Sequence, residues 1–369
     1  MDRPLDGFTI GITADRRADE QISMLSGRGA EVVHGPTIRT HPLRPEGEIA
    51  EATQMLLAEP PDLVLVSTAI GFRSWLGAAD SLGLGEALRD LLGRVPLVSR
   101  GPKARGAVVT AGLDVEWNAA TATYAEVVTH LGERGIDGHR VAIQLDGGPS
   151  QALVAGIESL GASVVAIPVY RWSLPDDCDP AAALVRQVAD RRVDALTFTA
   201  RPAVEHFVAI ADSLDCYEAV QAACADRVRV FSVGPVCAAA VHEHRLGSTL
   251  QPRAARLGSL VTCITEELAG RTRELAIGGH RVEWRGNRVV VEGAEPVTLT
   301  GRERDVFDAL AARPGVVSSK ADLLERVWGR EENDPHVVEV TIGRLRRRLG
   351  PAGVGIETVM RRGYRVSEV

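Results

Sequence analysis

The sequence predicts an α/β protein made of two similar lobes, followed by a small α+β domain. The chain has 369 residues, enough for two or three domains at ~100 to 200 residues each. Residues 2–269 alternate β-branched apolar runs with alanine-rich amphipathic stretches, the pattern of strands and helices in α/β folds. After residue 275 the pattern changes to short β segments and then to helical periodicity, which indicates a separate domain.

The composition is that of an ordinary globular protein, with 45% hydrophobic and 25% charged residues. No apolar run approaches the ~20 residues that span a bilayer, and the start MDRPLDGFTI lacks the basic and apolar regions of a signal peptide. The five cysteines are odd in number and have no CxxC spacing, which favours a reducing compartment. We therefore expect a cytoplasmic protein that makes no membrane contact.

Eight apolar runs are the predicted buried strands of the lobes. The runs are continuous rather than alternating, which is typical of parallel strands covered by helices on both faces. They occupy residues 9–13, 31–38, 63–67, 95–99, 141–145, 163–169, 195–199 and 228–233.

A weak internal repeat indicates that the two lobes are alike. Residues 63–69 (LVLVSTA) lead into a helix as residues 195–201 (ALTFTAR) do, and residues 98–104 (VSRGPKA) match residues 231–237 (FSVGPVC). Two further segments are rich in proline and far apart in sequence, so we expect them to cross between the lobes as a pair: residues 34–45 and 168–179.

These crossings set the predicted domain boundaries. One lobe is discontinuous, because the chain leaves it at the first crossing and returns at the second. The predicted parts are lobe 1 at residues 1–42 and 170–269, lobe 2 at 43–169, a linker at 270–274 and a C-terminal domain at 275–369.

The lobes resemble the uroporphyrinogen-III synthase family, whose members have two flavodoxin-like lobes joined by two strands. The resemblance covers about residues 5–269. It rests on a strand that ends in Ser, Thr and small residues at 66–71, on Gly-Pro turns at Gly101 and Gly234, and on the Val-Tyr-Arg strand end at 169–171. The family closes a linear tetrapyrrole into a ring with inversion of the last ring, and the resemblance implies no metal or cofactor.

The resemblance also implies where a ligand binds. The family's substrate carries eight carboxylates, and helix N-termini after strand ends offer free N–H groups and the positive end of the helix dipole. A tyrosine at the Tyr170 position is the implied catalytic residue, which aids loss of the leaving hydroxyl. The predicted ligand-binding residues are Thr68, Gly71, Gly101, Lys103, Gly147, Gly148, Tyr170, Thr199 and Gly234.

Several hydroxyl donors of the family pattern are missing from this chain. Ala104 and Cys237 stand where the family usually has threonine, three residues after the glycine of each Gly-Pro turn. Basic side chains could instead contact carboxylates directly, or they could be solvated surface residues: Arg73, Arg100, Lys103, Arg105, Arg171 and Arg201. A metal site is not expected at His242 and His244, since residues two apart do not share a helix face.

The C-terminal domain is predicted to open with a small antiparallel sheet and to continue with three helices. The β segments are at residues 275–277, 281–284, 288–291 and 297–299, separated by glycine-containing turns. Thr300 and Glu303 form the pattern of a capping box at the start of the first helix. The second helix is predicted at residues 320–328 and the third at about 335–349.

The third helix and the hairpin after it are strongly basic. Residues 344–365 hold seven arginines and one acid, Glu357, although the whole chain has a net charge of −7. Apolar residues at 338, 342, 345 and 349 form one stripe, so the arginines of this helix lie mostly on the other side. Such a helix suits the DNA major groove, where arginine contacts phosphates or guanine.

Four motifs of this domain resemble the winged-helix effector domain of OmpR/PhoB-type response regulators over its full length. They are LTGRE at 299–303, LLERVWG at 323–329, VEVTIGRLRRRLG at 338–350 and RGYRV at 362–366. The resemblance implies that the third helix enters the major groove and the hairpin, or wing, the minor groove. The implied DNA-binding residues are Trp328, Thr341, Arg344, Arg346, Arg347, Arg348, Thr358, Arg361 and Arg362.

These parts predict a DNA-binding transcriptional regulator whose synthase-like lobes act as a sensor or are a vestigial catalytic region. The alternative is an active uroporphyrinogen-III synthase, a cyclising hydro-lyase, with an appended DNA-binding domain. No phosphorylation receiver is expected, because Lys103 and Lys320 are the only lysines and neither fits its pattern. The expected partners are double-stranded DNA and a tetrapyrrole or other polycarboxylate; a homodimer, and a simple tether between the two parts, stay open.

Overall fold

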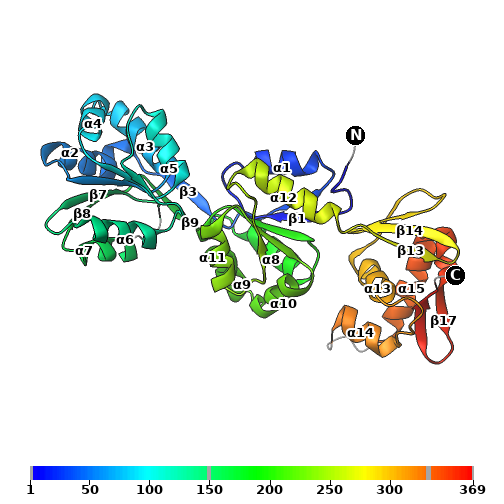
Figure 1. Cartoon of the computed structure of the whole chain (residues 1–369). Coiled ribbons are helices and arrows are strands. Elements are labelled where there is room, and N and C mark those ends of the chain that lie inside the picture. Colours follow the sequence, from blue (N-terminus) through cyan, green and yellow to red (C-terminus); the bar gives the residue numbers. More distant parts are fainter. Residues whose placement is uncertain (1–2, 148–150, 330–333, 368–369) are drawn as a thin grey trace.

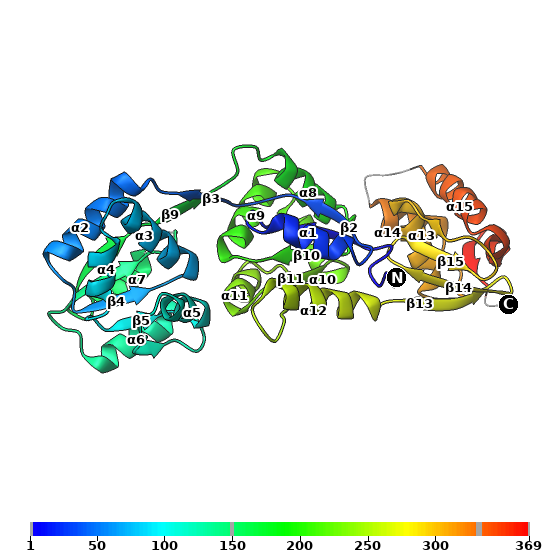
Figure 2. The same ribbon diagram turned by 90° about the horizontal axis from the view of Figure 1, so that it is seen from above.

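The computed structural model describes residues 3–147, 151–329 and 334–367. Three bodies follow one another in space: lobe 2, lobe 1 and the C-terminal domain, with lobe 1 in the middle in both ribbon views (Figures 1 and 2). Among the described residues, no helix is long and apolar enough to cross a membrane.

Lobe 1 is built on a five-stranded sheet whose strands are all parallel, in the order β12-β11-β10-β1-β2. Its strands are β1 (Thr9–Ile12), β2 (Glu31–His34), β10 (Ala195–Phe198), β11 (Arg229–Ser232) and β12 (Thr249–Leu250). One face is covered by α1 (Ala18–Ser26) and α12 (Leu257–Ala269). The other face is covered by α8 (Asp179–Ala189), α9 (Arg201–Ser213), α10 (Tyr217–Asp226) and α11 (Pro235–Glu243).

Lobe 2 has a second five-stranded parallel sheet, in the order β6-β5-β4-β7-β8. Its strands are β4 (Leu63–Val66), β5 (Leu97–Ser99), β6 (Trp117–Asn118), β7 (Arg140–Gln144) and β8 (Ser163–Ile167). The π-helical turn η1 (Pro45–Ile49) leads into the helices of one face, which are α2 (Ala50–Ala58), α3 (Ala69–Ser81), α4 (Gly85–Leu92) and α5 (Pro102–Thr110). The helices α6 (Tyr124–Arg134) and α7 (Gln151–Glu158) cover the other face.

The two sheets have the same arrangement with the chain order permuted. The run β10, β11, β12 in lobe 1 corresponds to β4, β5, β6 in lobe 2, and the pair β1, β2 corresponds to β7, β8. This correspondence explains the internal repeat, since the matching segments are β4 with β10 and β5 with β11. The order of lobe 1 is the flavodoxin-like one.

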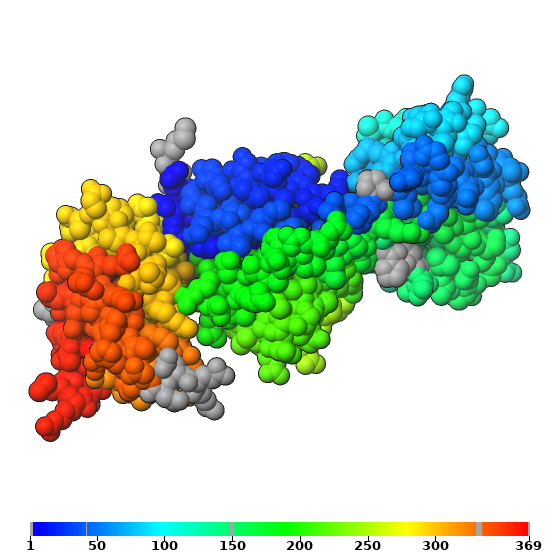
Figure 3. All heavy atoms as spheres, turned by 180° about the vertical axis from the view of Figure 1, so that it is seen from behind, coloured from blue at the N-terminus to red at the C-terminus, as the bar shows by residue number. Residues whose placement is uncertain are grey.

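Two antiparallel strands connect the lobes. They are β3 (Arg39–Pro42) and β9 (Tyr170–Ser173), with Thr40 paired to Trp172 and His41 to Arg171. The predicted strand at residues 31–38 was too long: β2 ends at His34, and residues 35–38 lead instead into the crossing. Figure 3 shows that lobe 2 joins the rest of the molecule through this narrow neck.

The C-terminal domain begins with the antiparallel sheet β13-β14-β15-β16. Its strands are β13 (Arg273–Ile277), β14 (His280–Arg285), β15 (Arg288–Val291) and β16 (Val297–Thr298). Three helices and a hairpin follow: α13 (Gly301–Ala311), α14 (Lys320–Trp328), α15 (His336–Arg348), the 3-10 turn η2 (Gly350–Gly355), β17 (Ile356–Val359) and β18 (Gly363–Val366). The predicted capping box of Thr300 and Glu303 is confirmed. Strand β13 starts inside the stretch 270–274 that was assigned to the linker.

Candidate DNA-binding surface and interlobe site

Helix α15 is held by one apolar face and leaves a second face open. Val338, Ile342 and Leu345 are buried against α13 and the hairpin β17-β18. Four of its exposed residues follow helical spacing on the other side: His336, Val340, Arg344 and Arg347. Glu339 and Arg348 are exposed as well. A helix fixed in this way presents a polar, basic edge to a large partner.

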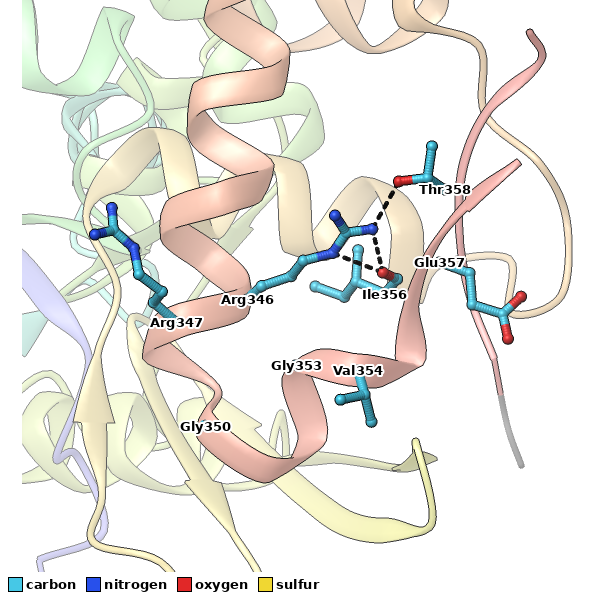
Figure 4. A pocket seen from close by; sticks show the side chains of 8 residues that line it. All are labelled: Arg346, Arg347, Gly350, Gly353, Val354, Ile356, Glu357 and Thr358. Atoms are coloured by element: carbon cyan, nitrogen blue, oxygen red, sulfur yellow. Dashed lines mark hydrogen bonds between the residues drawn. The ribbon is translucent and has the colours of Figure 1, made fainter. Parts of the chain in front are cut away.

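Arg346 ties α15 to the wing rather than pointing into solvent. Its guanidinium donates to the carbonyl of Ile356 through Nε at 2.8 Å and to Thr358 Oγ1 through Nη2 at 2.9 Å, as the dashed lines in Figure 4 show. It also lies 5.9 Å from the ring centre of Tyr364. Arg347 points away from these contacts in Figure 4 and borders a groove of about 620 Å³ between α15, η2 and β17.

Two more predicted DNA-binding residues of α15 are engaged inside the domain. Arg348 Nε lies 2.8 Å from Glu303 Oε2, and its Nη1 donates to the carbonyl of Thr298 at 3.1 Å. Thr341 is buried and donates to the carbonyl of Val337 at 2.7 Å. Burial opposes ionisation of Glu303, but the Thr300 N–H and Arg348 together hold the pKa of its carboxyl below the ordinary value. The Arg348–Glu303 pair thus connects α15 with α13.

The wing ends in an exposed basic turn. Met360, Arg361 and Arg362 connect β17 to β18, and all three side chains are exposed. Arg361 has a φ of 58° and so bends the hairpin at its tip. Trp328, at the end of α14, is half-buried, with the Arg302 guanidinium 5.6 Å from its ring centre.

The interlobe site lies where the sheets of both lobes have their carboxyl ends. In lobe 2, Thr68 caps α3: its Oγ1 accepts from the Gly71 N–H at 3.1 Å and lies 3.4 Å from the hydroxyl of Tyr170. Gly147 lies against the Tyr170 ring, where a Cβ would come within 2.4 Å of a ring carbon. Thr68, Gly71, Gly147 and Tyr170 are thus brought together; Gly148 lies outside the described residues.

A half-buried cluster beside Tyr170 was not predicted as a group. Arg100 Nη1 lies 2.7 Å from Asp146 Oδ2, and its guanidinium stands 4.6 Å from the ring centre of Tyr124. Burial raises the pKa of the Tyr124 hydroxyl. It also raises the pKa of Tyr170, but less strongly, and the hydrogen bond with the Thr68 hydroxyl acts to lower it. Asp146 lies two residues after the end of β7, a position from which its role could have been predicted.

The other predicted residues lie at helix starts on both sides of the site. Gly101 and Gly234 are the N-caps of α5 and α11, and Thr199 precedes α9. Lys103 lies in the first turn of α5, where desolvation and then the positive charge of Arg17 lower the pKa of its amine. Arg17 belongs to lobe 1 and Lys103 to lobe 2, so the two side chains are close enough for one charge to affect the other across the gap between the lobes.

Several arginines at this site are already paired with carboxylates of the same chain. Arg171 contacts Glu48 at 2.7 Å, and Arg201 contacts Glu205 at 2.8 Å as well as Glu243. Ala104 and Cys237, which replace the family's threonines, are buried, and burial raises the pKa of the Cys237 thiol to about 12. Within the described residues, no cluster of His, Cys, Asp and Glu could hold a metal ion.

Comparisons with known proteins agree with this geometry. The model of the family "Uroporphyrinogen-III synthase HemD" matches residues 19–262, and that of "Transcriptional regulatory protein, C terminal" matches residues 294–366. A uroporphyrinogen III synthase structure from Thermus thermophilus superposes with a TM-score of 0.61 at 25% identity, over 72% of this chain and all of that one.

Two curated relatives represent the two parts. A putative uroporphyrinogen-III synthase of Methanothermobacter thermautotrophicus is 26% identical over 239 residues, which are 64% of this chain and 89% of that protein. The transcriptional regulatory protein PrrA of Mycobacterium tuberculosis is 37% identical over 100 residues, which are 27% of this chain and 42% of PrrA.

Two flavodoxin-like lobes joined by a strand pair, with helix N-termini facing each other, define the class of two-lobed synthase folds. The chain belongs to the uroporphyrinogen-III synthase HemD family. Its C-terminal part is a winged-helix DNA-binding domain of the OmpR/PhoB type, so the molecule is a fusion of the two.

Proposed function

We propose that this protein is a transcriptional regulator that reads double-stranded DNA with α15 and the wing, and whose synthase-like lobes sense an anionic ligand. The observation that carries the proposal is that only some arginines of α15 and the wing have partners inside the domain. Arg346 and Arg348 make contacts inside the domain, whereas Arg344, Arg347, Arg361 and Arg362 are exposed. Exposed arginines on a fixed helix and a hairpin tip are available for phosphates and base edges.

The state of the interlobe site argues against tight binding of the family's own substrate. A substrate with many carboxylates has to displace the internal carboxylates that now neutralise Arg100, Arg171 and Arg201. The buried Ala104 and Cys237 offer no hydroxyl to replace them. Each buried acceptor of a ligand left without a donor costs about 1 to 3 kcal/mol, so the family's substrate should bind less tightly here.

The second candidate is an active uroporphyrinogen-III synthase with an appended DNA-binding domain. It is favoured by Tyr170, the first residue of β9, whose hydroxyl lies 3.4 Å from that of Thr68. In the family a tyrosine at this position aids loss of the leaving hydroxyl, so the residue most closely tied to catalysis is present.

A ring-closure assay separates the two functions. The linear tetrapyrrole is supplied to the full chain, and the ratio of inverted to spontaneous, non-inverted ring product is measured. A regulator leaves the spontaneous ratio unchanged and binds a specific promoter fragment. Clear acceleration of the inverted product that is lost in Tyr170→Phe, with DNA affinity unchanged, would establish the synthase and leave DNA binding as a separate activity.

A further inference from the structure

The C-terminal domain is packed against lobe 1 at the edge of the sheet where its parallel strands begin. The residues that precede these strands supply the lobe's side of the contact: Asp194 before β10 and Arg227 before β11. Helix α13 and the β14–β15 turn supply the other side. In Figure 3 this contact is broader than the neck between the two lobes.

The centre of the contact is an ion pair between Arg304 of α13 and Asp194. The two side chains are 14% and 6% exposed. The second carboxylate oxygen of Asp194 accepts from the Thr9 N–H of β1 at 2.8 Å, so the same carboxylate binds the effector helix and the central sheet of lobe 1. Any tilt of α13 away from the lobe would break this pair.

A second group of charges surrounds the first with the opposite polarity. Arg227 of lobe 1 contacts Asp305 of α13 at 2.5 Å and Asp308 at 3.1 Å. Asp308 also accepts from the Trp284 indole N–H at 3.2 Å. Lobe 1 and the C-terminal domain therefore each contribute both arginines and aspartates to the contact. A rotated arrangement would bring like charges together, so this pattern favours one orientation.

The β14–β15 turn makes a backbone contact with the N-terminal segment. The Asn287 N–H donates to the carbonyl of Gly7 at 2.8 Å, and Arg288 pairs with Asp6. A Cβ on Gly286 would come within 1.9 Å of the Gly7 carbonyl oxygen, so the two backbone segments touch and leave no room for a side chain. This contact is separate from the ion pairs and limits rotation about them.

The short connection makes even a modest interface persistent. Helix α12 ends at Ala269 and β13 begins at Arg273, so the domain cannot move far from the lobe. A short linker gives an effective concentration of about millimolar, which keeps a weak contact formed. Buried ion pairs add little net stability but make wrong orientations costly.

We propose that lobe 1 and the winged-helix domain form one rigid unit, locked by the Arg304–Asp194 and Arg227–Asp305 pairs in the orientation that leaves α15 free for DNA. Helix α15 lies on the far side of α13 from lobe 1 in both ribbon views (Figures 1 and 2). The interlobe site lies at the opposite edge of the same sheet. A ligand bound there would therefore affect DNA binding by changing the position of lobe 2 about β3 and β9. It would not act by releasing the winged-helix domain from lobe 1. The lock itself is independent of which ligand the lobes bind.

Hydrogen exchange at one amide tests the lock. The Asn287 N–H lies in a hairpin turn and its acceptor, Gly7, belongs to the N-terminal segment, so its protection reports docking rather than folding of the domain. We expect protection in the full chain and at least ten-fold faster exchange in Arg227→Met/Arg304→Met. Affinity for a short promoter fragment should change by less than two-fold, since α15 is untouched. Protection inside α13, at Leu310, controls for folding.

Two results would overturn the proposal. Unprotected exchange of Asn287 in the unaltered chain would show that the domain is only tethered. Equal protection in the chain and the double variant would show that the ion pairs do not hold it. Where the double variant loses protection at Leu310, Arg227→Met alone replaces it, because Arg227 belongs to lobe 1 and its removal breaks the pairs with Asp305 and Asp308 without altering α13.

Discussion

Two groups of arginines, one on the winged-helix domain and one near the interlobe site, differ in their partners. On α15 and the wing, Arg344, Arg347, Arg361 and Arg362 are exposed and form no ion pair within the described residues. At the interlobe site, Arg100, Arg171 and Arg201 are held by carboxylates of the same chain. Free surface cations attract a polyanion over a distance, whereas paired ones can only exchange one carboxylate for another.

The largest effect should come from removing the free arginines of α15. Arg344→Ala/Arg347→Ala should weaken DNA binding by ~100-fold or more, because each arginine that pairs with a base or phosphate contributes ~1 to 3 kcal/mol. The slope of log affinity against log salt should fall by about 0.9 for each lost phosphate contact. Titration of a promoter fragment at several salt concentrations measures both quantities.

A matched control has the same loss of charge on the same domain. Arg281→Ala/Arg313→Ala removes two exposed arginines, one on β14 that pairs with Glu274 and one that lies two residues after α13. It should leave the salt slope unchanged. Equal losses of DNA affinity in both double variants would mean that binding depends on net charge alone. Helix α15 would then not be the helix that contacts the DNA bases.

The wing should contribute less than the helix. Arg361→Ala/Arg362→Ala removes the charges of the hairpin tip, and we expect about ten-fold weaker binding with a smaller change in sequence preference, because minor-groove contacts distinguish bases poorly. Binding to the cognate fragment and to a scrambled one measures the two effects. A complete loss of preference would instead assign base reading to the wing.

Patterns of local sequence predicted most of the fold. Helix α14 was predicted at its observed bounds from the spacing of the apolar residues 323, 324 and 327, and the structure adds a Ser319 cap at its start. The likeness of the two lobes followed from comparing residues 63–69 with 195–201, the segments that hold β4 and β10, and the discontinuity of lobe 1 followed from the two proline-rich crossings. The stretch 35–38 was misread as strand because apolar residues also line a crossing between lobes.

The pairing of individual side chains could not be predicted. Arg346 and Arg348 stand in the same arginine run as Arg344 and Arg347, and helical spacing alone does not show that Ile356 and Glu303 lie within their reach. The Arg304–Asp194 contact joins residues 110 positions apart and depends on how two domains meet. Such contacts are set by tertiary packing, which no periodicity in the sequence records.

A smaller effect, on stability rather than on DNA contacts, should separate Arg348 from Arg344. Arg348→Ala should lower the free energy of unfolding of the C-terminal domain by about 1 kcal/mol, a modest value because Arg348 is itself half exposed. Arg344→Ala should leave stability unchanged. Denaturant unfolding followed by Trp284 and Trp328 fluorescence compares the two variants, and equal stability would place Arg348 among the free arginines.

The same pair predicts a pH dependence. The folded-state pKa of Glu303 is lowered, so its contribution to stability is full above the ordinary glutamate pKa of ~4.3 and is lost as pH falls through the lower folded value. The difference between the unaltered chain and Arg348→Ala should therefore shrink as the pH falls below about 4. A difference that stays constant down to pH 3 would show that Glu303 does not carry it.

The smallest expected effect tests whether internal carboxylates really occupy the interlobe site. Asp146→Asn removes the charge that neutralises Arg100, so a ligand carboxylate no longer has to displace it, and affinity for a polycarboxylate porphyrin should rise by about five-fold, or ~1 kcal/mol. Porphyrin fluorescence titration gives the affinity. Asp80→Asn is the matched control, because Asp80 pairs with Arg89 at the same 2.7 Å on the outer surface of lobe 2 and its loss changes the net charge equally. A gain in porphyrin affinity in Asp146→Asn alone would show that Arg100 can contact the ligand once Asp146 no longer neutralises it. Equal gains in both variants would mean that long-range charge explains the effect, and a loss in Asp146→Asn would show that the Arg100–Asp146 pair is needed to shape the site.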